Sequence, residues 1–485
     1  MFSWVGRWPR IALIGVGVWT LLLAGSGAFA WRLYHLDPHP TVDTVAEMNA
    51  RVRRDQPAGD NAWDALSDII VNDLGLSPPN YGRRFRRLGQ FARDVTILAG
   101  PWGAMDRAPY VGVLGDFRPT LDAMADAVDR PVFAKPYVHA GDALTGEQDA
   151  EARHPFWMIL LPELNPLRRL GTLNAFALRA AAETSDWDTA TRRFRAGLRL
   201  GRGLTRQSSL IEGLVGAALI YETVNEAARL TNEHDIPVSV ARDWIGEIEG
   251  LHYVSRDVIL RGLETESTGI FDAVQFLFSD DGAGSGVALG VDTDIIGLNG
   301  GGAPAALSDL GRASNLVAPF LFFSRRATEA EITAHFDRLM GAVDLPPAER
   351  SDAVRAIDAD AQTSMKTMAG LILPAFRGGI DTFAGADSAL AGLRVMLLLE
   401  IEHAQTGAWP ESIVEALGDA PIDPVSGEPF LYELLTDDPA GRAYELRVPW
   451  VDADSPLSVI NPPREALPGT LPTPPVPSAD LLVPE

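Results

Sequence analysis

The apolar run over residues 11–30 constrains the fold most, because it contains no charged side chain. A helix rises about 1.5 Å per residue, so roughly 20 residues cross the hydrocarbon core of a bilayer. Arg7 and Arg10 precede the run, and positive charge favours the cytoplasmic side. Aromatic residues that suit the headgroup level flank it at both ends: Trp4, Trp8, Trp31 and Tyr34. We predict a single transmembrane helix over residues 11–31 that inserts in the lipid bilayer, with residues 1–10 in the cytoplasm.

A cleaved signal peptide is the alternative for the same segment. The Ala-Phe-Ala sequence that ends at Ala30 has the form of a signal-peptidase site, and Gly25 and Gly27 precede it. The run is longer than the usual core of a signal peptide, and the bulky Trp31 and Arg32 follow at once, so we favour the anchor. Both interpretations place the rest of the chain outside the cytoplasm. The predicted location is the inner membrane, single-pass, with an extracytoplasmic, periplasmic bulk.

Charge and cysteine content exclude several classes of protein. The chain carries 65 acidic and 41 basic residues and a formal net charge of −24. Nucleic-acid binding and adhesion to anionic lipid both need clustered cations, so we expect neither. The 485 residues include no cysteine, which excludes disulfides, thiolate catalysis and cysteine-ligated metal sites.

Helical periodicity dominates from residue 44 to about residue 380, after an extended spacer over residues 32–43 that contains prolines. Trp63, Leu66 and Ile69 lie on one apolar stripe, and residues 161–230 read as a continuous set of helices. The pattern weakens between residues 100 and 146, where prolines and glycines interrupt it. Apolar side chains follow the helical period again at Phe271, Val274 and Phe278. Further helices are predicted over residues 305–324, 327–343 and 347–372.

One hairpin within this helical domain has the spacing of a tetratricopeptide unit. Trp187 and Phe194 are each followed three residues later by a small residue, Ala190 and Gly197, which lets two helices approach closely. The sequence contains no second or third copy, and an array needs neighbours to bury its face. We therefore predict one partly tetratricopeptide-like hairpin within a larger α-helical domain.

The pattern changes near residue 387. An apolar helix is predicted to end at Gly407, which would serve as its left-handed stop. The segment "ESIVEALG" predicts a short helix, and the turns at Asp423-Pro424 and Ser426-Gly427 lead into two strand-like runs. We predict a small α+β module over residues 387–460 and a proline-rich, disordered tail over residues 461–485. The fold class is thus mainly α, with a transmembrane helix and a small α+β module.

Residues 389–432 carry a recognisable motif. It reads Gly407-x-Trp409-Pro410-x-Ser412, then Asp423-Pro424-x-Ser426-Gly427-x-Pro429-Phe430-x-Tyr432. This pattern resembles the C-terminal module of an uncharacterised family of single-pass bacterial envelope proteins. That module is similar to the globular end of type II secretion pseudopilins, where a helix leads into a small antiparallel sheet. The resemblance implies a central helical domain and no assigned activity.

The N-terminal half departs from the pseudopilin pattern. A pilin-type leader carries a glutamate five residues into the mature apolar helix, whereas the run from Ile11 has no acidic residue. Some 350 residues also separate the apolar run from the C-terminal module, which a pilin helix reaches directly. We therefore reject a role as a pilus subunit, and we expect the sheet to serve in packing or docking.

The histidines do not have the two-histidine helical spacing of a zinc protease. They are His35, His39, His139, His154, His234, His252, His335 and His403. We expect structural roles for them.

The glycine-rich segment over residues 282–302 follows Asp280 and Asp281. These acids, with Asp292 and Asp294, could supply oxygen ligands for calcium, but the alternating spacing of a calcium loop is missing, so we favour a solvated loop. The glycines lack the spacing of a nucleotide cradle, and Ser285 lacks a nucleophile elbow, so we expect no nucleotide.

The sharpest basic patch contains Arg83, Arg84, Arg86, Arg87 and Arg93. An acidic partner or lipid headgroups could bind it, but we favour an amphipathic helix whose arginines pair with the abundant carboxylates. The acid pair Glu264 and Glu266 would serve a hydrolase only if the two carboxyl groups converged.

The sequence assigns no catalytic, cofactor-binding or metal-binding residue. The leading hypothesis is a membrane-anchored extracytoplasmic interaction or scaffold protein that binds another envelope protein. The alternatives are an envelope hydrolase built from dispersed acids and histidines, and an accessory to a secretion or pilus-like machine. A pocket lined by two or more of four residues would favour the hydrolase: His252, Glu264, Asp280 and His335.

Overall fold

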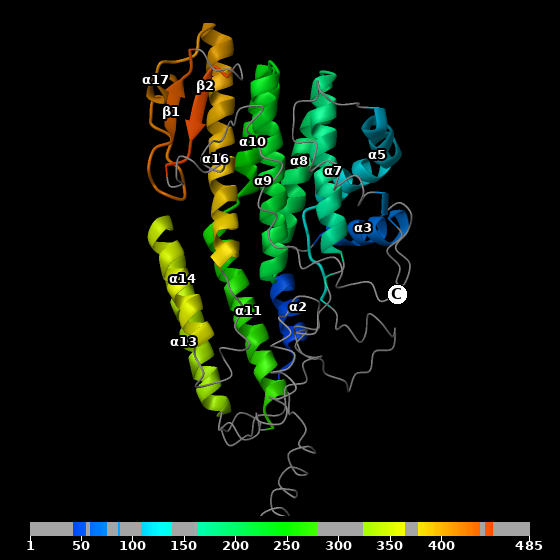
Figure 1. Ribbon diagram of the computed structural model, residues 1–485. Helices are drawn as coiled ribbons and strands as arrows, with labels where there is room; N and C mark the ends of the chain where they lie inside the picture. Colours follow the sequence, from blue (N-terminus) through cyan, green and yellow to red (C-terminus); the bar gives the residue numbers. More distant parts are fainter. Residues whose placement is uncertain are drawn as a thin grey trace, which may run out of the picture.

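Long helices form most of the molecule in the computed structural model (Figure 1). The structure describes residues 42–54, 59–74, 86–87, 108–137, 161, 163–279, 324–363, 377–436 and 442–449. The described elements are α2 (Thr44–Arg54), α3 (Ala62–Asp68), the π-helix η1 (Ile69–Asp73), α5 (Ala108–Val128), α7 (Leu164–Glu183), α8 (Trp187–Thr205), α9 (Leu210–Glu233), α10 (Val238–Leu251), α11 (Ser255–Leu277), α13 (Arg325–Val343), α14 (Pro347–Thr363), α16 (Arg377–Thr406), α17 (Ile413–Leu417), β1 (Leu431–Leu434) and β2 (Tyr444–Arg447). The prediction of a mainly α fold with a small sheet is confirmed.

The central helix of the bundle is α9, which packs against α7, α8, α11 and α16. Its contact with α8 is made by glycines. A Cβ atom on Gly201 would lie 2.7 Å from the carbonyl oxygen of Gly216, and one on Gly216 would lie 2.5 Å from the carbonyl oxygen of Gly201. Both distances are shorter than van der Waals contact allows, so the close approach of the two backbones requires glycine at both positions.

The predicted hairpin within residues 161–230 is present as α7 and α8. Its connection is short because the side chain of Asp186 accepts a hydrogen bond from the N–H of Thr189 and caps α8. The expected large-small spacing has a packing counterpart, since Gly197 faces Thr223 of α9 at close range and Phe194 stacks on Trp244 of α10 with ring centroids 4.6 Å apart. These contacts bury the hairpin within the bundle.

The described helices share two main cores. The larger core joins α8–α11, α13, α14 and α16 to the C-terminal sheet. The second core packs α3, η1 and α5 against α7 and α8, and it contains the predicted stripe residues Leu66 and Ile69. The other predicted stripe is also apolar and packed, with Val274 and Phe278 fully buried and Phe271 partly buried.

Helix α5 occupies a region where the sequence pattern weakens. It runs for 21 residues with Pro119 in its interior, where proline removes a backbone donor. The helix persists because Phe117, Leu121, Met124 and Val128 recur at helical spacing and are buried. Tertiary packing thus overrides a local helix breaker.

Helix α16 extends through the predicted division between the helical domain and the α+β module. It begins at Arg377, ten residues before the predicted start, and continues unbroken to Thr406. Gly407 ends it with φ +76° and an N–H donated to the carbonyl of His403 at 2.8 Å, which confirms the predicted left-handed stop. Buried side chains along α16 and the sheet belong to the same core.

The C-terminal sheet consists of two antiparallel strands in register from Leu431 opposite Arg447 to Leu434 opposite Tyr444. Ahead of it, the side chain of Asp423 is fully buried and accepts hydrogen bonds from the hydroxyls of Ser388 at 2.5 Å and Ser426 at 2.8 Å. The hydroxyl of Tyr432 donates to the carbonyl of Pro410 at 2.9 Å. The motif residues therefore fasten the turns of the module to α16.

One helix in the described part of the chain is long and apolar enough to cross a membrane by length and composition. It is Thr382–Thr406 within α16, with a mean hydropathy of 1.4 over a window that is 67% buried. A buried core helix passes the same test, and α16 lies in the core. The predicted anchor over residues 11–31 lies outside the described residues.

Several other predictions also fall outside the described residues. They concern residues 1–10 and most of the 32–43 spacer, the glycine-rich segment, the helix over residues 305–324, the end of the 347–372 helix and the tail from 461. The helix predicted over residues 327–343 is present as α13.

Candidate functional site

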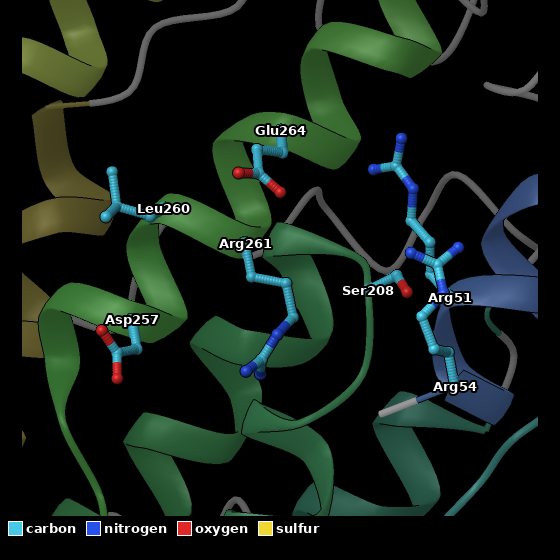
Figure 2. Close-up of a pocket in the computed structure, with 7 residues that line it drawn as sticks. All are labelled: Arg51, Arg54, Ser208, Asp257, Leu260, Arg261 and Glu264. Carbon is cyan, nitrogen blue, oxygen red and sulfur yellow. The ribbon is translucent and has the colours of Figure 1, made fainter. Parts of the chain in front are cut away.

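A pocket of about 470 Å³ opens where α2 crosses α11 near the start of α9. Its lining consists of Arg51, Arg54, Ser208, Asp257, Leu260, Arg261 and Glu264 (Figure 2). A volume of this size falls within the range of small-molecule sites. The two walls follow from helical geometry. Residues three apart on α2 share one face, and the four lining residues of α11 recur at the spacing of a single helical stripe.

Three contacts hold α2 antiparallel to α11. The N–H of Val42 donates to the side-chain oxygen of Gln275 at 2.9 Å, and the hydroxyl of Thr44 donates to Asp272 at 2.8 Å. Farther along α2, Arg51 donates to the hydroxyl of Thr268 at 3.3 Å. In these contacts the residue numbers increase along α2 and decrease along α11. Arg54 therefore lies opposite the first half of α11.

The arginines of the pocket have no carboxylate partner within the described residues. Arg261 donates to the backbone carbonyl of Thr205 at 3.1 Å, and Arg51 donates to a neutral hydroxyl. Elsewhere in the described parts, arginines such as Arg193 and Arg179 pair with acids. The pocket therefore presents guanidinium groups whose charge is not matched by an ion pair.

Two acidic side chains line the wall formed by α11. Asp257 is exposed and lies 3.8 Å from Arg256, which is not one of the lining residues. Glu264 is exposed and forms no ion pair with a described residue. In Figure 2 the arginines of α2 stand on one side, and the α11 residues stand on the other, with Ser208 between Arg261 and Arg54. The pocket is thus lined by arginines from both helices and by acids from α11.

A buried charge cluster lies behind the pocket. The ammonium group of Lys135 contacts a carboxylate oxygen of Glu163 at 2.5 Å and one of Glu212 at 3.0 Å. Its side chain is 4% exposed, and that of Glu212 is fully buried. The ammonium group also lies 4.7 Å from the ring centroid of Tyr137 and 5.8 Å from that of Trp63. Buried ions remain charged only with such partners, so the cluster stabilises its own charges.

Tyr137 links the buried cluster to the pocket. Its hydroxyl donates to Glu212 and accepts the backbone N–H of Ser208 at 3.0 Å. Asn49 of α2 exchanges two hydrogen bonds with the backbone of Tyr137, at 2.8 and 2.9 Å. The cluster therefore fixes the positions of both Ser208 and α2.

The buried acids and the tyrosine have shifted pKa values. Burial raises the pKa of Glu212 above its ordinary value, and the charge of Lys135 opposes that rise. Burial, followed by the charge of Glu212, raises the pKa of Tyr137 well above 10, so the phenol stays protonated and remains a donor. The neutral phenol can therefore bridge the carboxylate and the backbone at ordinary pH.

The structure separates the residues that a hydrolase would bring together. Of the four residues named above, Glu264 lines the pocket, His252 caps α10 in the left-handed region, and His335 is buried on α13. Burial lowers the pKa of His335 to about 4, so it is neutral at ordinary pH. Asp280 lies outside the described residues, as do Asp281, Asp292 and Asp294.

The other candidate residues do not form a site in the described regions. Glu266 lies two positions from Glu264, so the two side chains leave α11 on different sides, and burial raises the pKa of Glu266 to about 7. His234 ends α9, and His403 stacks on Trp409 with ring centroids 4.2 Å apart. Arg87 of the predicted basic patch pairs with Asp116. No group of three histidines or acids within the described residues could hold a metal ion.

Sequence reasoning missed the arginine-lined pocket. Arg51 and Arg54 share a helix face, and Asp257, Arg261 and Glu264 share another, so each half was visible as a stripe. The pairing of the two stripes was not visible, because it joins segments more than 200 residues apart. The residue type of Lys135 could have drawn attention to it, because arginine supplies almost all the positive charge of this chain.

Comparisons with known proteins give no match. No protein-family model matches the chain, and neither the curated proteins nor the solved structures yielded a similar one.

Proposed function

We propose that this chain is a membrane-anchored, extracytoplasmic helical binding protein of the bacterial envelope. The apolar run over residues 11–31 supports the anchor by its length, its lack of charge and its aromatic borders. Under this proposal the N-terminus is cytoplasmic and the described helical bundle lies beyond the membrane.

The pocket between α2 and α11 is the observation that carries a binding role. It is open, its guanidinium groups lack carboxylate partners within the described residues, and the cluster behind it holds its frame in place. The pocket also lies on the first described helix after the spacer. Of His252, Glu264 and His335, the described members of the hydrolase set, only Glu264 lines the pocket, so the proposal is binding rather than hydrolysis.

The hairpin of α7 and α8 and the C-terminal module supply the rest of the proposal. We propose that the hairpin is a solitary tetratricopeptide-like unit used as a packing scaffold, because its stripe is buried in the bundle.

The motif from Gly407 to Tyr432 supports kinship with the pseudopilin-like modules of single-pass envelope proteins. The module would then be the surface offered to an envelope protein partner.

Fractionation of cells that express the full chain tests the anchor. We expect the wild-type chain to stay in the membrane pellet after an alkaline carbonate wash, and external protease to digest it in spheroplasts. An N-terminal epitope tag should remain on the mature chain. The double variant Leu22→Arg/Leu23→Arg should lose membrane retention, because arginine at the centre of a span costs about 2.5–3.5 kcal/mol.

The matched control is Leu22→Ala/Leu23→Ala, which keeps the run uncharged and should remain in the pellet. Release of the wild-type chain by the wash, or protection of its C-terminus inside intact spheroplasts, would disprove the anchored orientation. Loss of the N-terminal tag with release of the chain would instead identify a cleaved signal peptide.

A further inference from the structure

We propose that the pocket between α2 and α11 binds a small zwitterion that carries a phosphate group and an ammonium group, as phosphoethanolamine does. The proposal rests on the binding role proposed above and adds the chemistry of the ligand. It follows from the mixed charge of the lining, in which α11 supplies the two acids and α2 supplies two of the three arginines.

The phosphate end is assigned to the arginines. Arg51, Arg54 and Arg261 contribute three guanidinium groups, and a phosphate offers more oxygen atoms to them than the two of a carboxylate. The side chain of Ser208 lines the same pocket from a residue that is 3% exposed, and its hydroxyl has no hydrogen-bond partner among the described residues. Its backbone is held by Tyr137, so this hydroxyl is a fixed polar group available to a phosphate oxygen.

The ammonium end is assigned to the acids. Glu264 and Asp257 would repel a simple polyanion in the same pocket, but they favour a ligand that also carries a positive group. A short zwitterion satisfies both walls. Figure 2 shows the carboxylates of α11 across from Arg51 and Arg54 of α2, with Arg261 between the two carboxylates.

Net charge supports the same ligand. The chain carries a net charge of −24, which opposes accumulation on anionic lipid or binding of a highly charged soluble anion. The ammonium group of such a ligand offsets one negative charge of its phosphate and so reduces this repulsion. A 12-residue spacer over residues 32–43 would span at most about 40 Å, and under the anchored orientation this length allows α2 to lie at the headgroup region. The zwitterion could thus be a lipid headgroup or a free molecule.

Titration calorimetry on the full chain in a maltoside detergent tests the proposal with three probes. Phosphoethanolamine should bind at least tenfold more tightly than inorganic phosphate, and ethanolamine should show no measurable binding. Arg54→Gln and Arg261→Gln should each weaken phosphoethanolamine binding at least tenfold, since hydrogen bonds between charged groups are the strong ones. Glu264→Gln should remove the preference over inorganic phosphate while keeping phosphate binding.

The matched control is Arg53→Gln, which changes an exposed arginine of the same helix that does not line the pocket. It should leave binding unchanged, and all variants should keep the wild-type unfolding midpoint. Absence of phosphoethanolamine binding, equal binding by the Arg54 variant, or tighter binding of the carboxylate zwitterion β-alanine would each overturn the proposal.

A second set of measurements identifies the source of the ligand. Binding to detergent-free vesicles of phosphatidylcholine with added phosphatidylethanolamine, competed by soluble phosphoethanolamine, assigns a lipid headgroup. Binding of the soluble probe without that competition assigns a free metabolite. These assays do not depend on cellular location, so they can fail while fractionation succeeds, and the reverse.

Discussion

Two groups of charged side chains lie next to each other in this molecule and differ in whether ion-pair partners balance their charges. The cluster of Lys135, Glu163 and Glu212 is buried, and its one ammonium group contacts both carboxylates. The arginines of the pocket are exposed or half-buried, and no described carboxylate pairs with them. The difference indicates that the first group stabilises the fold, whereas the second is available to a ligand.

The largest expected effect comes from removing the cation of the buried cluster. Lys135→Met leaves Glu163 and Glu212 buried without their ammonium partner, and we expect a loss of about 3–5 kcal/mol in the free energy of unfolding. Urea unfolding followed by tryptophan fluorescence measures it. Adding Glu212→Gln to this variant should restore part of the loss. A loss below about 1 kcal/mol would contradict a structural role for the cluster.

The next largest loss of stability is expected at Tyr137, which links the buried cluster to the pocket. Tyr137→Phe removes the hydroxyl that joins Glu212 to the N–H of Ser208, and we expect a loss of about 2 kcal/mol because two buried polar groups lose a partner. Tyr432→Phe is the control, since its hydroxyl contacts only the carbonyl of Pro410 at a less buried position, and it should cost less. Equal losses in the two variants would argue against the link.

Glu400 is a half-buried acid for which the described residues supply no cation, so it contrasts with Glu212, which has Lys135. Burial, followed by the charge of Asp235, raises the pKa of Glu400 from 4.5 to about 8. A carboxyl group whose pKa is raised by folding loses stability as the pH rises through that interval. Glu400→Gln should therefore be more stable than wild type above pH 8, by on the order of 1 kcal/mol after solvent screening. At pH 4 the two should be equal, and an advantage that persists at pH 4 would contradict this origin.

The smallest effect on stability is expected at the pocket. Arg54→Gln should change the free energy of unfolding by less than about 0.5 kcal/mol, because the side chain is exposed and pairs with no described acid. The same urea titration measures it beside Lys135→Met. A large loss at Arg54 would show that the pocket arginines are structural, and the contrast between the two groups would fail.

Strong periodicity made much of the bundle predictable from sequence. The set of helices over residues 161–230, the stop at Gly407 and the antiparallel strands are present, since each depends on local spacing or on a conformation that glycine adopts. Helix α5 was not predicted, because Pro119 argues against a helix locally while Phe117 and Leu121 favour it only once their core partners are in place.

The pocket was less predictable than the bundle. In the sequence, Glu264 forms an acid pair with Glu266 that could serve a hydrolase. The structure instead places Glu264 opposite the arginines of α2. That juxtaposition depends on Thr44 and Arg51 meeting Asp272 and Thr268 across more than 200 residues of sequence. Helical spacing defines a face, but it does not say which other face covers it.

The unbroken length of α16 has a mechanical consequence. Its 30 residues form a rod about 45 Å long that anchors the sheet at one end and crosses the helical core along the rest. The sheet and this helix share one hydrophobic core, so a pulling force on the sheet is transmitted through that core into the bundle. The sheet therefore shares the stiffness of the bundle, and the two parts resist load as one body.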